Sequence, residues 1–244
     1  MEIQRQPLPA NFEDIALRHQ KNFHAVVPFK PKSEIIIALD LTGQNKTLEP
    51  NTFSDTELFS AYIYNILERN HAKFAIGGYG ENRIVYSRSK LFDSNKPDEE
   101  PRTIHLGIDV WGVVGTPVLA FMGGMVHSTG FNNQFGDYGA TLILLHQLDG
   151  LPFYTLYGHL SLQDIEKLVP GNYVSIGQTI GHFGNTNENG YWPPHLHFQI
   201  ILDIGMYRGD YPGVCKISEK VKWLSNSPDP ETILQLTKFA IKSL

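Results

Sequence analysis

Short hydrophobic runs alternate with glycine-containing turns in the second half of the chain. Six such runs follow residue 103: IHLGIDVWG, TPVLAFMGGMVHS, YGATLILLHQL, LPFYTLYGHL, GNYVSIGQTIGHFGN and HLHFQIILD. Apolar segments of this length and spacing are typical of a β-sandwich or an open barrel. We therefore predict a mainly β domain, built from antiparallel strands, in this part of the chain.

The N-terminal part of the chain mixes both kinds of element. A β-branched run at residues 34–41 predicts a strand, and Ser54 with Glu57 forms a capping box that starts a helix ending near Asn70. The stretch KFAIGGYGENRIVYS predicts a hairpin, because no lysine with a serine or threonine follows its glycines as a phosphate loop requires. These elements predict an α+β N-terminal region.

A polar linker and a final helix complete the expected organisation. Residues 89–102 are rich in acid and proline, as in a linker or a long surface loop. Near the C-terminus, Asp229 as N-cap and Pro230 predict a helix that buries Ile233, Leu236 and Ala240. We predict three regions, at residues 1–100 (α+β, role unknown), 101–212 (the β domain) and 213–244 (an extension with a helix).

Composition narrows the class of protein. The 244 residues carry a formal charge of −5 and show no run of basic residues, so nothing indicates a nucleic-acid partner. Cys215 is the single cysteine, which excludes an internal disulfide. No apolar stretch is long enough to cross a membrane, and the N-terminal sequence lacks the apolar segment of an export signal. We expect a cytoplasmic protein from the sequence as given, or a periplasmic or secreted one if a signal was removed.

Two histidines stand one residue apart in the run WPPHLHFQII. On a strand, His195 and His197 project from one face, while Leu196 and Phe198 project from the other into a core. Two imidazoles on one face indicate a metal or catalytic site, although a pair of surface histidines has the same pattern. Because they lie roughly 6.5 Å apart along a strand, one metal ligand and one catalytic group is the more natural division.

The pattern His105-Leu106-Gly107-Ile108-Asp109 adds two further ligand types. In a straight strand His105 and Asp109 would lie roughly 13 Å apart, too far to share one ion. A bend at Gly107, which has no Cβ, would bring them together. With one histidine of the pair above they give three ligands and an open fourth position, the layout of a catalytic zinc site. The other histidine and His159 would supply a general base and an oxyanion donor.

The motifs HLGID, YGHLS and HLHF, in this order, resemble the signature of lysostaphin/LytM-type zinc metallopeptidases, the peptidoglycan endopeptidase family with the duplicated hybrid motif fold. GTPVLAFMGGMV, YGATLILLH and VSIGQTIGHFGNT also match the family, so the resemblance covers about residues 103–203. It implies a β-sheet groove with one zinc ion on its floor. It also implies that His105, Asp109 and His197 are the ligands and His159 and His195 the catalytic pair. The implied reaction is attack on a peptide carbonyl by a zinc-polarised water.

The chain departs from the family's pattern beside the second pair of histidines. Trp192-Pro193-Pro194 replaces a small residue and glycine before a single proline, and Gln199 stands where glutamate is usual. Residues 1–100 match none of the usual accessory parts of secreted members. Two alternatives to a peptidoglycan-type endopeptidase therefore stay open: a non-catalytic or latent zinc-binding regulatory module, and a cytosolic zinc amide hydrolase with a non-wall substrate.

Overall fold

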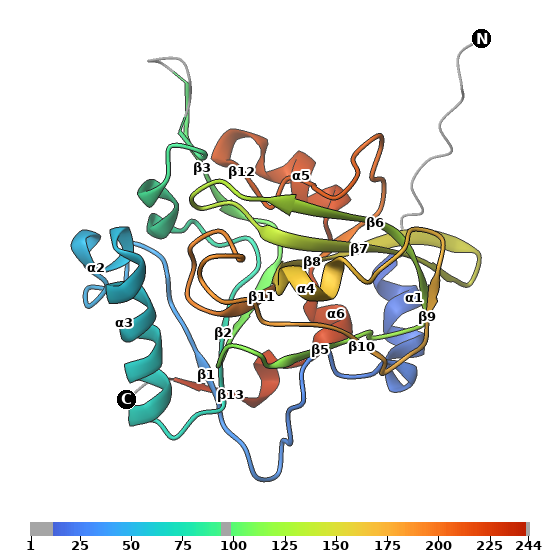
Figure 1. The fold of residues 1–244 in the computed structure, drawn as a ribbon, viewed down its shortest axis with the longest axis horizontal. Helices are drawn as coiled ribbons and strands as arrows, with labels where there is room; N and C mark the ends of the chain where they lie inside the picture. Colours follow the sequence, from blue (N-terminus) through green and yellow to red (C-terminus); the bar gives the residue numbers. More distant parts are fainter. Residues whose placement is uncertain (1–11, 94–98, 243–244) are drawn as a thin grey trace.

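The computed structural model describes residues 12–93 and 99–242 (Figure 1). Part of the N-terminal stretch for which the sequence predicts no export signal, and the middle of the polar linker, lie outside the described residues. Among the helices described, none is both long and apolar enough to cross a membrane.

A nine-stranded mixed sheet organises the described residues, in the order β13-β1-β2-β4-β11-β8-β7-β6-β9. Its strands in chain order are β1 (Ile36–Ala38), β2 (Phe74–Gly77), β4 (Ile108–Trp111), β6 (Gly124–Asn132), β7 (Gly139–Leu148), β8 (Leu151–Leu160), β9 (Tyr173–Val174), β11 (His195–Ile201) and β13 (Ala240–Lys242). Two small antiparallel sheets pair β5 (Pro117–Leu119) with β10 (Thr179–His182) and β3 (Arg102–His105) with β12 (Val214–Lys216). The predicted mainly β fold is confirmed.

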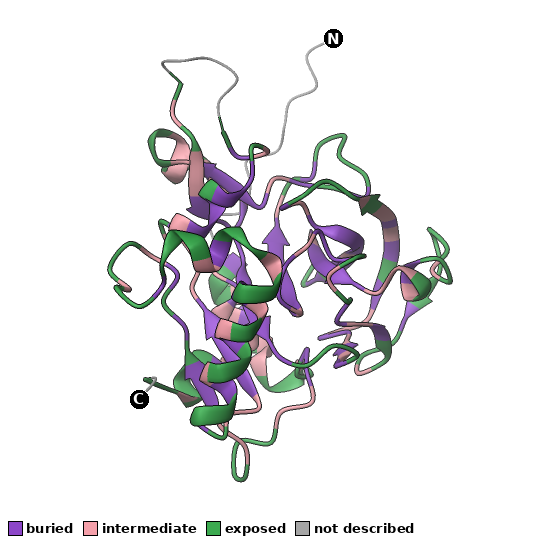
Figure 2. Ribbon diagram, turned by 60° about the vertical axis from the view of Figure 1, so that its left-hand side comes forward, coloured by how far each residue is buried: buried purple, intermediate pink, exposed green. Residues whose placement is uncertain are grey.

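Helices lie around this sheet, and most of them combine buried with exposed residues (Figure 2). They are α1 (Phe12–His19), α2 (Pro50–Ser54), α3 (Thr56–Arg69), α4 (Leu162–Ile165), α5 (Lys220–Asn226) and α6 (Glu231–Leu234), with 3₁₀ turns η1 (Gln20–Asn22), η2 (Ile84–Arg88), η3 (Ile217–Glu219) and η4 (Thr237–Phe239). The longest, α3, buries Phe59, Ile63 and Leu67 at helical spacing. These side chains share a core cluster with Ile37 of β1 and Ala75 of β2.

The predicted helix in the N-terminal region exists, but its start is displaced. Asp55, rather than Ser54, is the N-cap of α3, and its side chain accepts hydrogen bonds from the backbone N–H groups of Glu57 and Leu58. Ser54 instead ends the short helix α2. The predicted end is confirmed, because Asn70 is the C-cap residue.

The predicted hairpin at KFAIGGYGENRIVYS is wrong. Its first half is β2, but β2 already has β1 on one side and β4 on the other, so no edge is free for a hairpin partner. The chain crosses instead to β3, where Arg83 N–H donates to the Thr103 carbonyl, and residues 84–88 form the 3₁₀ turn η2.

The predicted C-terminal helix is much shorter than expected. Glu231 N–H donates to the Asp229 side chain as the capping pattern predicts, but the helix α6 ends at Leu234. Gln235 has a positive φ of 46° and turns the chain away. Ala240, predicted on the buried face of that helix, lies in β13 opposite Ile36 of β1. Pairing with the open edge of the sheet thus replaces the last helical turns.

The nine-stranded sheet draws strands from all three predicted regions. β1 and β2 come from residues 1–100, the central strands from residues 101–212, and β13 from the C-terminal extension. The division of the sequence into three regions stays a prediction, but in space these strands share one sheet. The N-terminal strand β2 is therefore a direct neighbour of β4, which carries Asp109 of the predicted site.

Candidate metal centre

Alternation along β4 and β11 separates the core from the site. Leu196 and Phe198 point into the largest core cluster, as predicted. Asp109 and His197 stand opposite each other in the antiparallel register and project from the other face. The strand pairing alone therefore brings a carboxylate and an imidazole together.

Gly107 is where the chain bends between β3 and β4, as predicted. β3 ends at His105, and β4 begins at Ile108 in a different sheet. A Cβ atom on Gly107 would lie 2.6 Å from Cε1 of His197, so only glycine allows this close approach. The bend brings His105 Nε2 to 3.2 Å from Asp109 Oδ1, instead of the separation of a straight strand.

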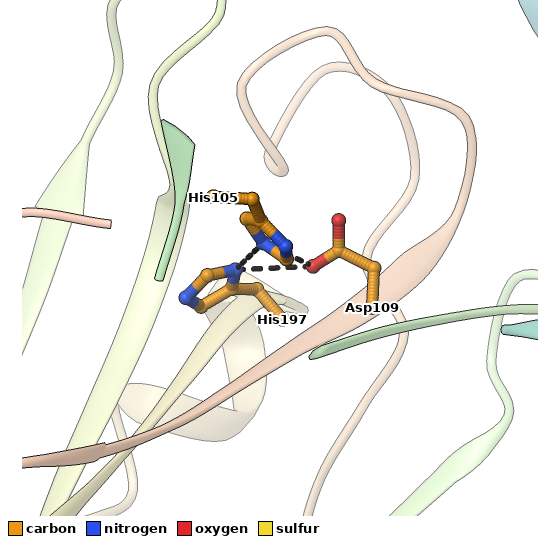
Figure 3. Close-up of side chains that lie close together, drawn as sticks. All are labelled: His105, Asp109 and His197. Carbon is orange, nitrogen blue, oxygen red and sulfur yellow. Dashed lines mark hydrogen bonds and ion pairs between the residues drawn. The ribbon is translucent and has the colours of Figure 1, made fainter. Parts of the chain in front are cut away.

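Three buried ligand atoms converge at this point (Figure 3). His105 Nε2 lies 2.9 Å from His197 Nδ1, which is itself 3.0 Å from Asp109 Oδ1. Figure 3 shows that the second carboxylate oxygen of Asp109 turns away from both imidazoles. Together these three residues could hold one metal ion. Tetrahedral zinc with bonds of about 2.0–2.1 Å separates its ligand atoms by roughly 3.3 Å, close to the distances found here.

The neighbours of the two imidazoles determine where their protons lie. His105 Nδ1 lies 3.0 Å from the Gly78 carbonyl, which can only accept, so Nδ1 carries the proton. Gln199 donates to the Pro212 carbonyl through Nε2, so its Oε1, at 2.9 Å, accepts from His197 Nε2. In these tautomers His105 Nε2 and His197 Nδ1 each carry a lone pair, and both atoms face Oδ1 of Asp109. Such a set of acceptors fits a cation.

Burial and nearby charges give Asp109 and His105 the protonation states that bind a cation. Burial would raise the pKa of Asp109, but the charge that His105 carries in acid and the permanent charge of Arg83 outweigh burial and hold that pKa well below its usual range. Burial, with the charge of Arg83, lowers the pKa of His105 to about 4. At neutral pH the carboxylate is thus ionised and the His105 imidazole is neutral, which are the states that bind metal.

His159 and His195 form a second pair beside the first group. Their rings stack with centroids 4.0 Å apart, His159 directly before the end of β8 and His195 at the start of β11. Each Nδ1 faces a backbone carbonyl, at Asn189 and Pro193 respectively, both at 2.7 Å. Nδ1 is therefore protonated in both, and each Nε2 carries a lone pair. Burial lowers the pKa of both imidazoles, that of His195 to about 4.

The five predicted site residues are buried, and aromatic rings pack against the four histidines among them. His105, Asp109, His159, His195 and His197 are each between 1% and 6% exposed. Trp192 packs against both His159 and His195, and Tyr86 lies between Trp192 and His105. A cavity of about 140 Å³ remains above the site and is lined by Asp109, His159, His195 and His197 among others.

The structure brings together all five residues that the sequence predicted, although their roles stay predictions. Arg83, Tyr86 and the Gly78 carbonyl were not predicted at the site. Their segment lies before the linker and shows no ligand motif, so no local signal in the sequence marks them. In the sequence Gln199 stands out only because the family usually has glutamate there. In the structure its side chain contacts His197, so it belongs to the site.

Comparisons with known proteins find similarity over part of the chain. Residues 103–207 match the family described as Peptidase family M23. Lysostaphin from Staphylococcus staphylolyticus is 40% identical over 100 residues, which cover 41% of this chain and 19% of lysostaphin. Peptidoglycan DD-endopeptidase ShyC from Vibrio cholerae serotype O1 is 31% identical over 99 residues, which cover 41% and 20%. The chain thus spans about a fifth of the length of these relatives.

The catalytic domain of lysostaphin from Staphylococcus simulans aligns at 23% identity and a TM-score of 0.42, over 72% of this chain and 97% of that chain.

Proposed function

We propose that the protein is a zinc-dependent endopeptidase, because residues 103–207 of this chain form a Peptidase family M23 domain. Its substrates would be short peptides of peptidoglycan type, because one relative is named as a peptidoglycan DD-endopeptidase. Another relative, from Bacillus subtilis, is named as an L-Ala--D-Glu endopeptidase.

One observation carries this proposal. His105 Nε2, His197 Nδ1 and Asp109 Oδ1 converge within 3.2 Å of one another, directly beside the stacked pair His159 and His195, and in the tautomers assigned above all three are acceptors. Three protein ligands with a neighbouring acid–base group are what metal-assisted hydrolysis of an amide requires. A structural zinc site would instead be closed by a fourth protein ligand.

His105, Asp109 and His197 would hold the zinc ion. Bound there, zinc would act as a Lewis acid and lower the pKa of water. The Nε2 lone pairs of His159 and His195 can accept the proton that an attacking water loses. The protonated imidazole then donates a hydrogen bond to the oxyanion or a proton to the leaving amine. The carbonyls of Asn189 and Pro193 keep both rings in the tautomer that this role needs.

The test is cleavage of purified peptidoglycan and muropeptides by the zinc-loaded full chain, followed as newly released amino groups. We expect His159→Ala to bind one zinc ion as the wild type does and to lose at least about 100-fold in kcat/KM, the size of a general acid–base contribution. His127→Ala is the matched control, because His127 bonds Ser128 and lies outside the site. Zinc-loaded wild type that cleaves no peptidoglycan or small peptide would refute the proposal, and a screen of small amides would then test the amide-hydrolase alternative.

A latent form of the same peptidase is the second candidate, favoured by the cover over the site. His159 and His195 are 6% and 3% exposed, and Trp192 packs on both. In a latent form, the cavity of about 140 Å³ that His159 and His195 help to line would have to widen before a peptide could bind. If the site must open first, excess EDTA will remove zinc at a rate that does not depend on the EDTA concentration. A rate that rises linearly with EDTA concentration would show that EDTA reaches the ion without a slow opening step, and would contradict the latent form.

A further inference from the structure

The glycine-rich segment at residues 77–83 closes the outer side of the metal centre. It lies outside the matched residues 103–207, and the sequence pattern had assigned it to a hairpin turn. We propose that Arg83, carried by this segment, is the positioning residue that holds Asp109 as a one-oxygen metal ligand. The inference rests on the zinc site proposed above.

Several contacts fix the guanidinium of Arg83 next to Asp109. Its guanidinium is 2% exposed and forms an ion pair with Oδ2 of Asp109, the oxygen that faces away from the imidazoles. Nε donates to Glu81 Oε2 at 3.0 Å, and the group lies over the ring of Trp111. A guanidinium bound in this way has a fixed orientation, and so does the carboxylate that it holds.

The two oxygens of Asp109 therefore have separate partners. Oδ1 faces His105 Nε2 at 3.2 Å and His197 Nδ1 at 3.0 Å, while Oδ2 belongs to Arg83. A carboxylate without Arg83 could rotate about its Cβ–Cγ bond or approach the ion with both oxygens. Arg83 removes that freedom before an ion arrives, which is the way outer contacts usually improve a metal site.

The same segment also orients His105. The Gly78 carbonyl accepts from His105 Nδ1, and the Glu81 carbonyl accepts from the His105 backbone N–H at 2.9 Å. Gly77 permits this packing, because a Cβ there would lie 2.7 Å from the Trp111 ring and 2.9 Å from an Arg83 nitrogen. Residues 77–83 thus supply outer contacts to two of the three proposed ligands, His105 and Asp109.

The positive charge of Arg83, taken alone, would weaken zinc binding, whereas its positioning of Asp109 would strengthen it. A buried cation next to a zinc ion repels it, so a purely electrostatic role predicts tighter zinc binding when the charge is removed. Positioning predicts weaker binding, because Asp109 would lose its orientation and keep a buried, unpaired oxygen. The two roles therefore predict opposite changes in zinc affinity when the charge is removed, and we expect the positioning role to dominate.

The experiment measures zinc affinity of the full chain by competition with a chromophoric chelator, and the visible spectrum of the cobalt-substituted protein. We expect Arg83→Gln to bind zinc about 10–100-fold more weakly and to shift the cobalt bands. Arg83→Lys keeps the charge but not the fork of donors, so it should bind more weakly than wild type and more tightly than Arg83→Gln. Arg88→Gln is the matched control, since Arg88 is also buried in the N-terminal region and contacts aromatic rings instead of Asp109.

The outcomes separate this inference from the proposed function. If wild type binds no zinc, the proposed zinc site fails. If wild type binds zinc and Arg83→Gln binds it equally or more tightly, the positioning role of Arg83 is refuted while the zinc site stands. If Arg83→Gln does not fold, Arg83→Lys decides, because affinity and a cobalt spectrum equal to wild type would refute the role on their own.

Discussion

The amide oxygen of Gln199 lies 2.9 Å from Nε2 of His197, on the far side of the imidazole from His105 and Asp109. It fixes the proton on Nε2 and leaves Nδ1 free for a metal. Gln199→Leu keeps the volume of the side chain but removes this acceptor. We expect zinc affinity to fall about 10-fold or more, because His197 loses its preferred tautomer and orientation. Competition with a chelator measures the change.

Gln199→Glu is the control for that prediction, because it retains an oxygen next to His197 Nε2. Its second oxygen would replace Nε2 of Gln199, which donates to the Pro212 carbonyl at 3.1 Å and to Ser227 Oγ at 2.9 Å. We expect zinc affinity at or above the wild-type value, with a lower melting temperature in EDTA. Equal zinc affinities for wild type and Gln199→Leu would show that this contact does not orient the ligand.

Gly107 can be tested by adding one methyl group. In Gly107→Ala the new Cβ would lie 2.6 Å from Cε1 of His197 and 2.7 Å from the carbonyl oxygen of Phe198. His197 or the backbone must move, at a cost of about 1–3 kcal/mol in the free energy of unfolding. Because His197 is a predicted ligand, zinc affinity should fall together with stability. Urea unfolding and chelator competition measure the two effects.

Gly43→Ala is the control for Gly107→Ala. A Cβ on Gly43 would meet Cγ2 of Ile84 at 3.5 Å, which is ordinary van der Waals contact. We expect this variant to keep wild-type stability within about 0.5 kcal/mol, the usual range for surface substitutions, and to bind zinc normally. If Gly107→Ala were equally harmless, the bend at Gly107 would not depend on glycine.

The sequence predicted those features that local periodicity encodes. The alternating runs became strands, and the separation of His105 from Asp109 in a straight strand correctly predicted a bend at Gly107. The division of His195 and His197 followed from strand spacing, and the structure puts them in different groups. Their roles as catalyst and ligand still depend on the activity test.

Features that depend on distant partners could not be predicted in this way. Residues 74–77 look like half of a hairpin, but β1 and β4 occupy both edges of that strand. Ala240 fits a helical stripe, but the open edge of β1 binds it as a strand. Arg83 is an ordinary basic residue in sequence, and only the fold brings it to Asp109.

Trp192 has a buried indole N–H that finds no hydrogen-bond partner among the residues described. An unsatisfied buried donor costs about 1–3 kcal/mol, so Trp192→Phe removes a penalty together with part of the ring. We expect its free energy of unfolding to lie within about 1.5 kcal/mol of wild type. Trp192→Ala should instead lose about 3–5 kcal/mol, because Arg88, Phe59 and Tyr86 would face a cavity.

Urea unfolding of both Trp192 variants in EDTA checks this prediction without zinc. A loss in Trp192→Phe as large as that in Trp192→Ala would contradict it, and would indicate that the indole N–H has a partner such as an ordered water. The comparison also bears on the cover of the site, since phenylalanine would retain the aromatic contact with His159 and His195.

His146 should make the stability of the protein sensitive to acid. It is 2% exposed, away from the metal group, and burial lowers its pKa to about 4. The unfolded chain, with a pKa of about 6.5, therefore binds a proton at pH 5 that the folded protein does not. Stability from this residue is present above pH 6.5 and is lost as the pH falls toward 4. Between pH 7 and pH 5 the loss is about 2 kcal/mol.

His146→Gln should remove that part of the acid sensitivity. Glutamine can still bond the Gly123 carbonyl or Thr155 Oγ1, the two partners of His146, but it does not titrate. Urea unfolding in EDTA at pH 7 and pH 5 should show a loss about 2 kcal/mol smaller than in wild type, because the other buried histidines titrate in both proteins. Phe153→Leu, which removes a ring stacked on His146, should lower stability equally at both pH values. If His146→Gln and wild type lost the same stability between pH 7 and pH 5, His146 would be protonated in the folded protein, and its burial would not exclude the charged form.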